Sequence, residues 1–476
     1  MRKNFINGEW RDTTDAGDNV NPSDIRDVVG VYAKAEASDV ETAVASARAA
    51  APGWAWSTPQ QRFDVLDFIG SEILARKQEL GRLLAREEGK ILAEGIGETA
   101  RAGQVFKFFA GEALRNSGEH IRSVRPGIEV DVQRDPIGVV GVITPWNFPI
   151  AIPAWKIAPA LAFGNAVVFK PADLVPGCAW ALAEILSRSG LPDGAFNLVM
   201  GRGSVIGEAL VTHPGVAGIS FTGSVEVGQQ LAVKCVQRMA KVQLEMGGKN
   251  PFVVLDDADL DTAVTCSVNG AYFSTGQRCT ASSRLIVTEG IHDRFVTAMK
   301  ARLEALKVDD ALGETTDIGP VVDQSQLDKN LAYIEIGKKE GARLVCGGER
   351  LERSKEGYYL APALFTETDN TMRINREEIF GPVASVIRVK DYDQALATAN
   401  DTEFGLSSGI CTTSLKYASH FRQNAQAGMV MVNLPTAGVD YHVPFGGRKG
   451  SSYGTREQGR YAVEFYTTVK TCYTAA

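Results

Sequence analysis

Short apolar runs that alternate with longer segments dominate the middle of the chain. The runs are V-V-G-V-I-T at 139–144, A-V-V-F at 166–169, F-N-L-V at 196–199 and G-I-S-F at 218–221. Strands that alternate with helices are typical of βαβ units, so this pattern predicts a parallel sheet. Ligands of such sheets bind beyond the carboxyl ends of the strands, where the unusual polar residues of this chain lie.

Other patterns flank this region. Apolar side chains recur every three or four residues before it, as in an amphipathic helix: Phe63, Leu66, Ile69 and Ile73. We expect Ser38 to cap a helix and Asn7-Gly8 to turn a hairpin. Residues 121–137 alternate apolar and polar positions, which predicts a strand with one wet face at a sheet edge or an assembly surface. A second α/β segment extends to about residue 447, and the β-branched tail predicts a terminal strand that needs a partner.

Composition narrows the class of protein. A length of 476 residues predicts two or three domains, and 44% hydrophobic residues with 22% charged residues are typical of a globular enzyme. The formal charge of −7 disfavours a binder of nucleic acid or of an anionic membrane. We find no secretory signal and no apolar run long enough to span a bilayer. The seven dispersed cysteines indicate reduced thiols in the cytoplasm, and no zinc motif is present.

A candidate nucleophile lies in the stretch F-S-T-G-Q-R-C-T-A-S-S-R at 273–284. Cys279 stands there among small and hydroxylated residues, in a turn-like segment between two apolar ones. The reactive form of cysteine is the thiolate, and a free thiol with a pKa of ~8.5 is only slightly ionised at neutral pH. Cys279 therefore needs a base or an electropositive setting.

Two further residues have the chemistry that a cysteine nucleophile requires. Asn147, in T-P-W-N-F-P, carries an amide that can stabilise a developing oxyanion, although the same amide could simply hydrogen-bond to backbone in a turn. Glu245 ends the apolar run V-Q-L-E-M-G-G-K, and partial burial would raise the pKa of its carboxyl towards the range of a general base.

Polar residues also follow the predicted parallel strands. Lys170 and Asp173 come where the adenosine ribose of a dinucleotide would lie, and Ser224 opens a helix whose free N–H groups suit a pyrophosphate. Gly203 and Gly207 belong to a G-x-G-x-x-x-G segment that departs from the usual dinucleotide fingerprint. Together these strand ends predict a dinucleotide site.

Seven motifs stand in the order and approximate spacing of one family. They are P-W-N-F-P, K-P, F-T-G-S, E-M-G-G-K, G-Q-R-C, E-E-I-F-G-P and P-F-G-G. The chain resembles the NAD(P)-dependent aldehyde dehydrogenase superfamily along nearly its whole length. The resemblance implies that the substrate aldehyde is oxidised through a thiohemiacetal and a thioester on Cys279, with Asn147 and the Cys279 amide at the oxyanion and Glu245 activating water. It also places Lys156 among the catalytic residues.

The resemblance implies the remaining site residues as well. The cofactor, NAD or also NADP, would be bound by Thr144, Trp146, Lys170, Asp173, Gly203, Gly207, Ser224, Glu378 and Phe380. The substrate would contact Arg278, Trp155 and Phe445, and no metal is expected. Arg278 could receive a substrate carboxylate by a bidentate contact or form a structural salt bridge.

The fold implied is α/β, with a Rossmann-type nucleotide-binding domain, an α/β catalytic domain and a small β oligomerisation element. We expect the nucleotide-binding domain at 1–120 and 138–247, the catalytic domain at 248–447, oligomerisation strands at 121–137 and 463–476, and a return segment at 448–462. The family implies a homodimer or a homotetramer.

Within the family the loop N-L-P-T-A-G-V-D-Y-H-V-P-F-G-G looks most like that of 2,5-dioxovalerate (α-ketoglutarate semialdehyde) dehydrogenases. Alternatives are a succinate- or glutarate-semialdehyde dehydrogenase and an enzyme of broad specificity. Succinic semialdehyde enzymes typically carry an arginine where this chain has Trp155. An enzyme that acylates coenzyme A commonly lacks the glutamate at position 245, and a non-catalytic scaffold protein need not retain Cys279 and Glu245 together.

Overall fold

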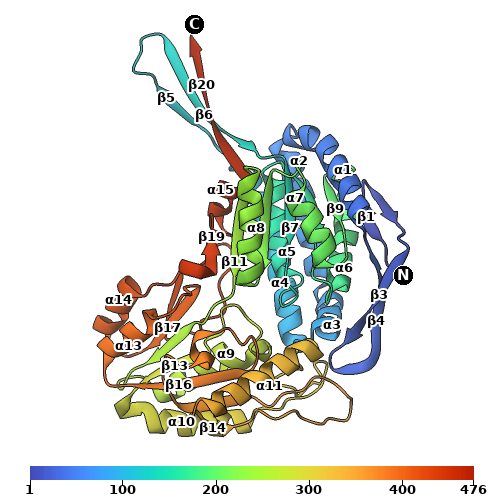
Figure 1. The fold of residues 1–476 in the computed structure, drawn as a ribbon. Coiled ribbons are helices and arrows are strands. Elements are labelled where there is room, and N and C mark those ends of the chain that lie inside the picture. Colours follow the sequence, from blue (N-terminus) through green and yellow to red (C-terminus); the bar gives the residue numbers. More distant parts are fainter. Residues whose placement is uncertain (476) are drawn as a thin grey trace.

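An eight-stranded sheet forms the largest layer of the protein, in a computed structural model that describes residues 1–475 (Figure 1). The strand order is β19-β11-β10-β7-β8-β9-β1-β2. The bounds are Asn4–Ile6 (β1), Glu9–Arg11 (β2), Val139–Ile143 (β7), Ala166–Lys170 (β8), Phe196–Leu198 (β9), Gly218–Gly223 (β10), Lys241–Met246 (β11) and Ser452–Tyr453 (β19). Strands β7 to β11 are parallel, which confirms the prediction made from the apolar runs.

Helices cover both faces of this sheet (Figure 1). Alternate residues of a strand point to opposite faces, so Val167 and Phe169 pack with one helical layer while Val168 packs with the other. The first layer contains Pro59–Ala75 (α2), Lys77–Glu88 (α3), Leu92–Ala113 (α4), Ala151–Ala162 (α5) and Pro176–Ser187 (α6). The second contains Ala37–Ala55 (α1), Glu208–Thr212 (α7) and Val225–Gln237 (α8).

A second sheet, of seven strands, occupies the lower part of the molecule (Figure 1). Its order is β14-β15-β16-β13-β12-β17-β18, and only β14 is antiparallel to its neighbour. The strands are Pro251–Val254 (β12), Arg284–Thr288 (β13), Arg343–Cys346 (β14), Ala363–Thr368 (β15), Val383–Val389 (β16), Ser407–Cys411 (β17) and Met429–Val432 (β18). The helices are Leu260–Tyr272 (α9), Glu289–Glu304 (α10), Gln324–Lys339 (α11), Arg373–Arg376 (α12), Tyr392–Asn400 (α13) and Leu415–Asn424 (α14), whereas Val463–Tyr466 (α15) packs with the first sheet.

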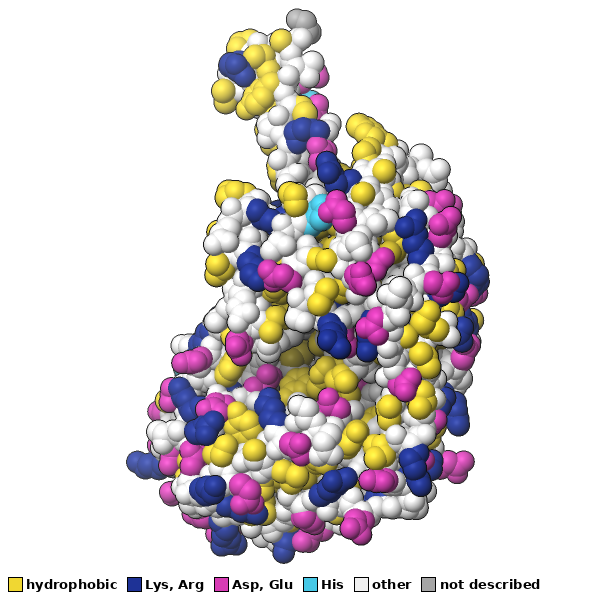
Figure 2. All heavy atoms as spheres, turned by 45° about the vertical axis from the view of Figure 1, so that its right-hand side comes forward, with side chains coloured by type: hydrophobic (Ala, Val, Ile, Leu, Met, Phe, Trp, Pro, Cys, Tyr) yellow, Lys and Arg dark blue, Asp and Glu magenta, His cyan; other side chains and the backbone are white. Residues whose placement is uncertain are grey.

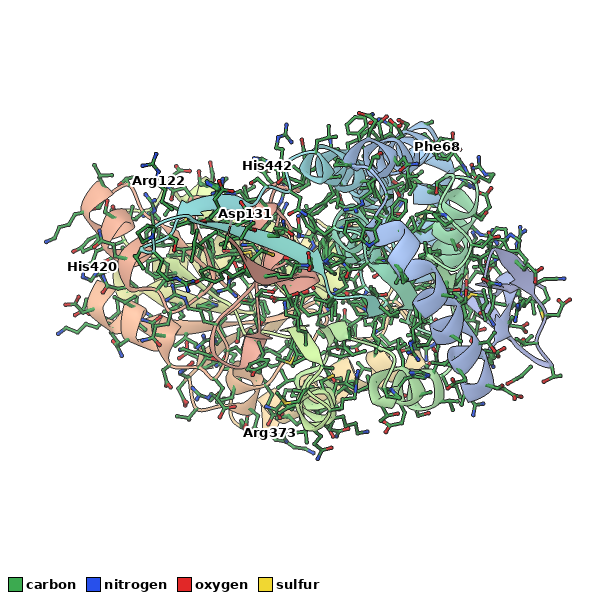
Figure 3. The ribbon with its side chains drawn as sticks, turned by 90° about the horizontal axis from the view of Figure 1, so that it is seen from above. Phe68, Arg122, Asp131, Arg373, His420 and His442 are labelled. Atoms are coloured by element: carbon green, nitrogen blue, oxygen red, sulfur yellow. The ribbon has the colours of Figure 1, made fainter. Side chains whose placement is uncertain are left out.

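A three-stranded arm projects from the top of the molecule (Figures 1 and 2). It consists of Glu119–Arg122 (β5), Ile128–Pro136 (β6) and Thr467–Ala475 (β20), and β20 pairs antiparallel with β6 along its whole length. The tail therefore finds its predicted partner within the chain. Exposed apolar side chains on the arm are Ile121, Val124, Val469 and Tyr473. In the view from above, Arg122 and Asp131 lie towards the side of His420 on α14, away from Phe68 on α2 (Figure 3).

Two local predictions need correction. Residues 121–137 form no single strand, because Pro126-Gly127 turns the chain between β5 and β6. The N-cap of helix α1 lies two residues before the expected Ser38, since Glu36 is the N-cap and Asp39 completes a reciprocal capping box. The hairpin at Asn7-Gly8 is confirmed, and both residues have the positive φ that such a turn requires.

Two small elements complete the N-terminal part. Strands Asp15–Asn21 (β3) and Asp24–Lys34 (β4) form a separate two-stranded sheet beside the N-terminus (Figure 1).

No helix between residues 1 and 475 is both long and apolar enough to cross a bilayer. The same residues contain no group of three His, Cys, Asp or Glu side chains that could hold a metal ion.

Candidate active site

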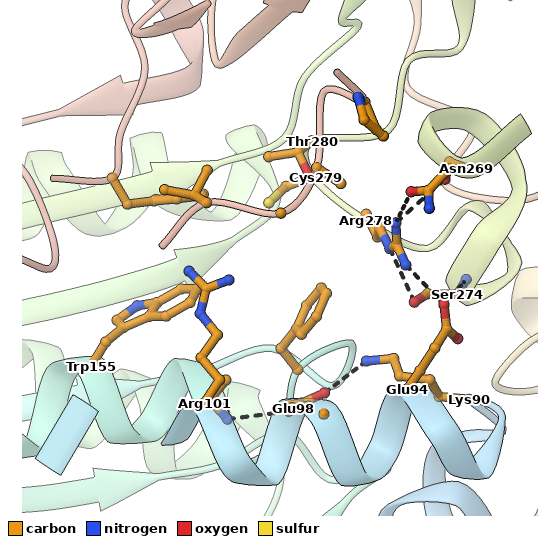
Figure 4. Close-up of a pocket in the computed structure, with 18 residues that line it drawn as sticks. Lys90, Glu94, Glu98, Arg101, Trp155, Asn269, Ser274, Arg278, Cys279 and Thr280 are labelled. Carbon is orange, nitrogen blue, oxygen red and sulfur yellow. Dashed lines mark hydrogen bonds and ion pairs between the residues drawn. The ribbon is translucent and has the colours of Figure 1, made fainter. Parts of the chain in front are cut away.

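A cavity of about 470 Å³ opens between helix α4, helix α5 and the loops at 274–280 and 435–445 (Figure 4). Cys279 lies in its wall, while α4 and α5 form the opposite side (Figure 4). The lining residues include Lys90, Glu94, Glu98, Arg101, Trp155, Asn269, Ser274, Arg278, Cys279 and Phe445. The cavity therefore combines one thiol with three cationic side chains, two acids and aromatic rings.

The backbone before Cys279 is unusual. Helix α9 ends at Tyr272, and the next residues turn sharply because Ser274 and Thr275 have φ values of 52° and 57°. Left-handed backbone is unfavourable for residues with a Cβ, and such strain is typical of functional sites. The backbone carbonyl of Cys279 accepts a hydrogen bond of 2.7 Å from Nδ2 of Asn250, which anchors the loop below the thiol.

The resting thiol of Cys279 is protonated. Burial raises its pKa to about 12, and the charges of Glu378 and Glu245 act in the same direction, while the backbone N–H groups of Cys279 and Thr280 oppose them. At neutral pH almost none of a group with such a pKa is thiolate. Attack on a carbonyl therefore requires that the proton leave Cys279 as the reaction begins.

Asn147 is buried beside this loop. Its Nδ2 donates a hydrogen bond of 2.9 Å to the backbone carbonyl of Gln277. The backbone carbonyl of Asn147 accepts a hydrogen bond of 2.7 Å from Nζ of Lys90. The amide thus makes the backbone contact that a turn residue would make. An asparagine amide has two N–H donors, so one of them is left for another acceptor.

Glu245 lies at the end of β11 and is 2% exposed. One carboxylate oxygen accepts a hydrogen bond from the Ser452 hydroxyl, and the other has no hydrogen-bond partner among residues 1–475. Burial and the charge of Glu457 raise the pKa of Glu245 well above its ordinary value, while Ser452 and Lys156 act against that shift. Burial thus shifts the pKa of this carboxyl in the direction that makes it a stronger base.

Lys156 makes its contacts on the side of Glu245 and not with the loop that carries Cys279. Its Nζ donates a hydrogen bond of 2.9 Å to the Ser220 hydroxyl and forms an ion pair with the carboxylate of Glu457. Both partners of this ion pair are buried. Lys156 thus affects the pKa of Glu245 through Glu457. Sequence reasoning missed Glu457 and Ser452 because neither belongs to a recognisable motif.

Glycine is required where two acids approach the backbone. A Cβ on Gly247 would lie 2.1 Å from Oε2 of Glu378, and one on Gly446 would lie 2.6 Å from Oε1 of Glu245. The backbone N–H of Gly248 donates a hydrogen bond of 2.9 Å to Oε1 of Glu378. The E-M-G-G-K, E-E-I-F-G-P and P-F-G-G motifs therefore meet around one site.

Residues predicted to hold a dinucleotide gather at the carboxyl ends of β7, β8 and β10. Lys170 forms an ion pair of 3.0 Å with Asp173, and the backbone N–H of Thr144 donates a hydrogen bond of 3.2 Å to the Lys170 carbonyl. Ser224 caps α8 by accepting a hydrogen bond of 3.4 Å from the N–H of Val227.

The same edge carries open glycines and aromatic rings. Gly203 and Gly207 bound a short π-helical turn, and a Cβ on Gly207 would meet nothing within 4 Å. The rings of Trp146 and Phe380 meet edge to face, with centroids 5.3 Å apart. Phe380 has a φ of 63°, which is rare for an aromatic residue. Backbone, cation and hydroxyl groups with open space before them are what a pyrophosphate and a nicotinamide require.

The predicted substrate residues also line the cavity. Trp155 stacks on Phe445, with ring centroids 5.3 Å apart and planes inclined by 28°. Arg278 is already engaged, because it forms an ion pair of 2.8 Å with Glu94 and donates a hydrogen bond of 3.0 Å to the Ser274 hydroxyl. Of the two alternatives for Arg278, the salt bridge is the one the contacts support.

Comparison with known proteins places the chain in a family. The model of the aldehyde dehydrogenase family matches residues 10–472. The chain belongs to the aldehyde dehydrogenase family. An α-ketoglutaric semialdehyde dehydrogenase of Bacillus subtilis is 45% identical, over 99% of this chain and 97% of its own length. A 2,5-dioxopentanoate dehydrogenase of Saccharolobus solfataricus is 40% identical over 95% of both chains.

Solved structures confirm the fold of this aldehyde dehydrogenase. A betaine aldehyde dehydrogenase of Staphylococcus aureus in complex with NAD⁺ has a TM-score of 0.97 and is 34% identical, over 100% of this chain and 94% of that one. An NADP-dependent enzyme of Escherichia coli has a TM-score of 0.96 at 36% identity, over 100% of this chain and 98% of that one. The predicted α/β architecture is thus confirmed, and so is the assignment of the chain as an aldehyde-oxidising enzyme.

The arrangement in this aldehyde dehydrogenase suits acyl chemistry on sulfur. A thiol, an amide donor and a buried carboxyl from three distant segments lie close together. Sequence reasoning overlooked Lys90, two residues before α4, and three charged residues on α4, namely Glu94, Glu98 and Arg101. Their spacing of three or four residues would have revealed one helix face, but nothing in it distinguished a cavity wall from a solvated surface.

Proposed function

We propose that this enzyme oxidises α-ketoglutarate semialdehyde (2,5-dioxovalerate) to the corresponding dicarboxylate with NAD⁺ as the hydride acceptor. The observation that carries the proposal is Cys279 in the wall of a cavity with cationic side chains, with Asn147 bonded to the adjacent Gln277 and Glu245 close enough for its charge to act on the thiol. The names of the relatives from Bacillus subtilis and Saccharolobus solfataricus support the same substrate. A cavity with a thiol and cations suits an aldehyde that carries a remote carboxylate.

The proposed reaction begins when Cys279 loses its proton and its sulfur attacks the aldehyde carbon. The developing oxyanion would accept hydrogen bonds from the free N–H of Asn147 and from the backbone N–H of Cys279. Loss of one such donor typically costs about 10²–10³ in kcat. The bound nicotinamide supplies the hydride acceptor, and Cys279 is left carrying the acyl group as a thioester.

Glu245 would complete the cycle by hydrolysis. Its carboxylate takes a proton from water, the water oxygen attacks the thioester carbon, and the sulfur of Cys279 departs as thiolate. Burial and the charge of Glu457 raise the pKa of Glu245, which makes its carboxylate a stronger base towards water. A buried base of this kind supports hydrolysis in preference to acyl transfer to coenzyme A.

We propose that the first sheet binds the cofactor and that the second sheet carries the catalytic domain. The polar residues that follow β7, β8 and β10 would hold the dinucleotide, with Trp146 and Phe380 near its nicotinamide end. Residues 1–120 and 138–247 would then form the nucleotide-binding domain and residues 248–447 the catalytic domain. The open glycines, the Ser224 cap and the Lys170 ammonium fit this cofactor.

Asp173 is expected to make the enzyme prefer NAD⁺ to NADP⁺. Its carboxylate is 44% exposed at the cofactor edge, where it can accept from a ribose 2′-hydroxyl and would repel a 2′-phosphate. We expect kcat/KM for NAD⁺ to exceed that for NADP⁺ by roughly tenfold or more, in line with ~1.4 kcal/mol per tenfold. Asp173→Asn should narrow the gap, whereas Asp193→Asn, another exposed acid, should not. Equal efficiencies in the wild type would refute this role.

A panel of aldehydes tests the proposed substrate. NADH formation is measured with α-ketoglutarate semialdehyde, glutarate semialdehyde, pentanal and benzaldehyde. We expect the carboxylated aldehydes to exceed pentanal in kcat/KM by about 10²-fold, because a site built for a charged group rejects an analogue that leaves it unpaired. A higher kcat/KM for pentanal or benzaldehyde would contradict the substrate assignment while leaving the aldehyde chemistry intact.

A further inference from the structure

Three cationic side chains line the cavity, and only one of them lacks a carboxylate partner within the described residues. Lys90 is paired with Glu98 at 2.8 Å, and Arg278 is paired with Glu94 at 2.8 Å. Arg101, which follows on the same helix face, forms no such pair. Figure 4 shows its guanidinium extending from α4 into the cavity, beside Trp155 and across from Cys279.

Arg101 is held in place by its neighbours, but not all of its hydrogen-bond donors have acceptors. One Nη donates a hydrogen bond of 3.2 Å to Oε1 of Gln458, and the guanidinium lies 5.9 Å from the ring centroid of Trp155. Its Nε is buried and has no hydrogen-bond partner. Gln458 is itself fully buried with a φ of 56°, so the residue that positions Arg101 adopts a backbone conformation that is costly for a side chain.

An unpaired guanidinium in such a place calls for an anion. Burial lowers the pKa of Arg101, and the more distant charges of Glu98 and Asp440 only partly offset that shift. A buried donor without a partner costs free energy, and a carboxylate can accept two parallel hydrogen bonds from one guanidinium. Trp155, whose indole Nε1 is also buried without a partner, lines the same cavity.

We propose that Arg101 binds the carboxylate of the substrate and so determines specificity for ω-carboxylated aldehydes. The inference rests on the proposed function, since it assigns a residue to the remote end of the same substrate. It gives Arg278 a different role, which is to hold the nucleophile loop to α4 through Glu94 and Ser274. The cavity then has its reacting end at Cys279 and its recognition end at Arg101.

The test compares glutarate semialdehyde with pentanal, which have the same chain length. In Arg101→Met the ratio of the two kcat/KM values should fall about 10²-fold, as for loss of a charge-assisted pair. The second readout is inhibition of pentanal oxidation by 2-oxoglutarate, whose inhibition constant should rise by a similar factor in Arg101→Met. Arg101→Lys keeps the charge without the fork and should retain part of the preference.

Lys107→Met is the matched control. Lys107 lies on the same helix, is paired with Asp67 at 2.6 Å and does not line the cavity, so the ratio and the inhibition constant should stay at wild-type values. An unchanged ratio in Arg101→Met, or equal losses with both aldehydes, would overturn the inference, as would collapse of the ratio in Arg278→Met alone. A wild-type enzyme that oxidises neither aldehyde would instead overturn the proposed function.

Discussion

Cys279→Ser should form no NADH from any aldehyde and should still bind NAD⁺. A serine hydroxyl is a far weaker nucleophile than a thiolate. We expect kcat to fall below about 10⁻³ of the wild-type value, as for other enzymes that lose their nucleophile. Steady-state absorbance measures the loss, and calorimetric titration with NAD⁺ measures the retained binding.

Cys472→Ser is the control for loss of a thiol elsewhere. Cys472 lies on β20 in the arm, partly exposed and distant in sequence from the cavity, and this variant should keep full activity. Turnover in Cys279→Ser at the wild-type rate would remove Cys279 from the mechanism. Loss of NAD⁺ binding would show instead that the substitution damages the cofactor edge.

Glu245→Gln should give one burst of NADH per active site and then stall. Acylation and hydride transfer do not need the carboxylate as a base for water, but hydrolysis of the thioester does. Loss of a general base costs about 10²–10⁴ in rate, so steady-state turnover should fall within that range. Glutamine keeps an oxygen that can accept from the Ser452 hydroxyl, which preserves the local geometry.

Stopped-flow absorbance separates the burst from the steady state. Glu226→Gln provides the comparison, because Glu226 is an exposed acid in the first turn of α8 and should behave as the wild type. Absence of a burst would mean that Glu245 acts before hydride transfer. A normal steady state without Glu245 would mean that another base activates the water.

Sequence patterns predicted the large sheet because its central strands are buried on both faces. A strand such as β7 must then be apolar at every position, and residues 139–143 stand out for that reason. The arm was harder to predict. Its strands have one wet face, and the turn at Pro126-Gly127 interrupts the alternation that identified them. The cap of α1 was misplaced because Ser38 and Glu36 both offer an oxygen, and only the observed backbone decides between them.

Motifs led to the proposed nucleophile and the proposed base, but not to the residues that set their environment. Cys279 and Glu245 lie in segments with recognisable glycines and small residues. Glu457 shifts the pKa of Glu245, and Arg101 lines the cavity, yet each is an ordinary charged residue in its own segment. Their proximity arises from the packing of α4, α5 and the segment after residue 447, which no local spacing encodes.

Enclosure of the charged residues on and just before α4 makes the cavity insensitive to ionic strength. The side chains of the Lys90–Glu98 pair are only 1% and 2% exposed, and counterions act over a Debye length of about 8 Å in the surrounding solution. Salt therefore screens the long-range interaction between the protein and the approaching substrate, but it does not screen the buried ion pairs of the cavity. The chain has a formal charge of −7, which repels the proposed monoanionic substrate at long range, so added salt weakens that repulsion and accelerates encounter while the cavity keeps its internal field.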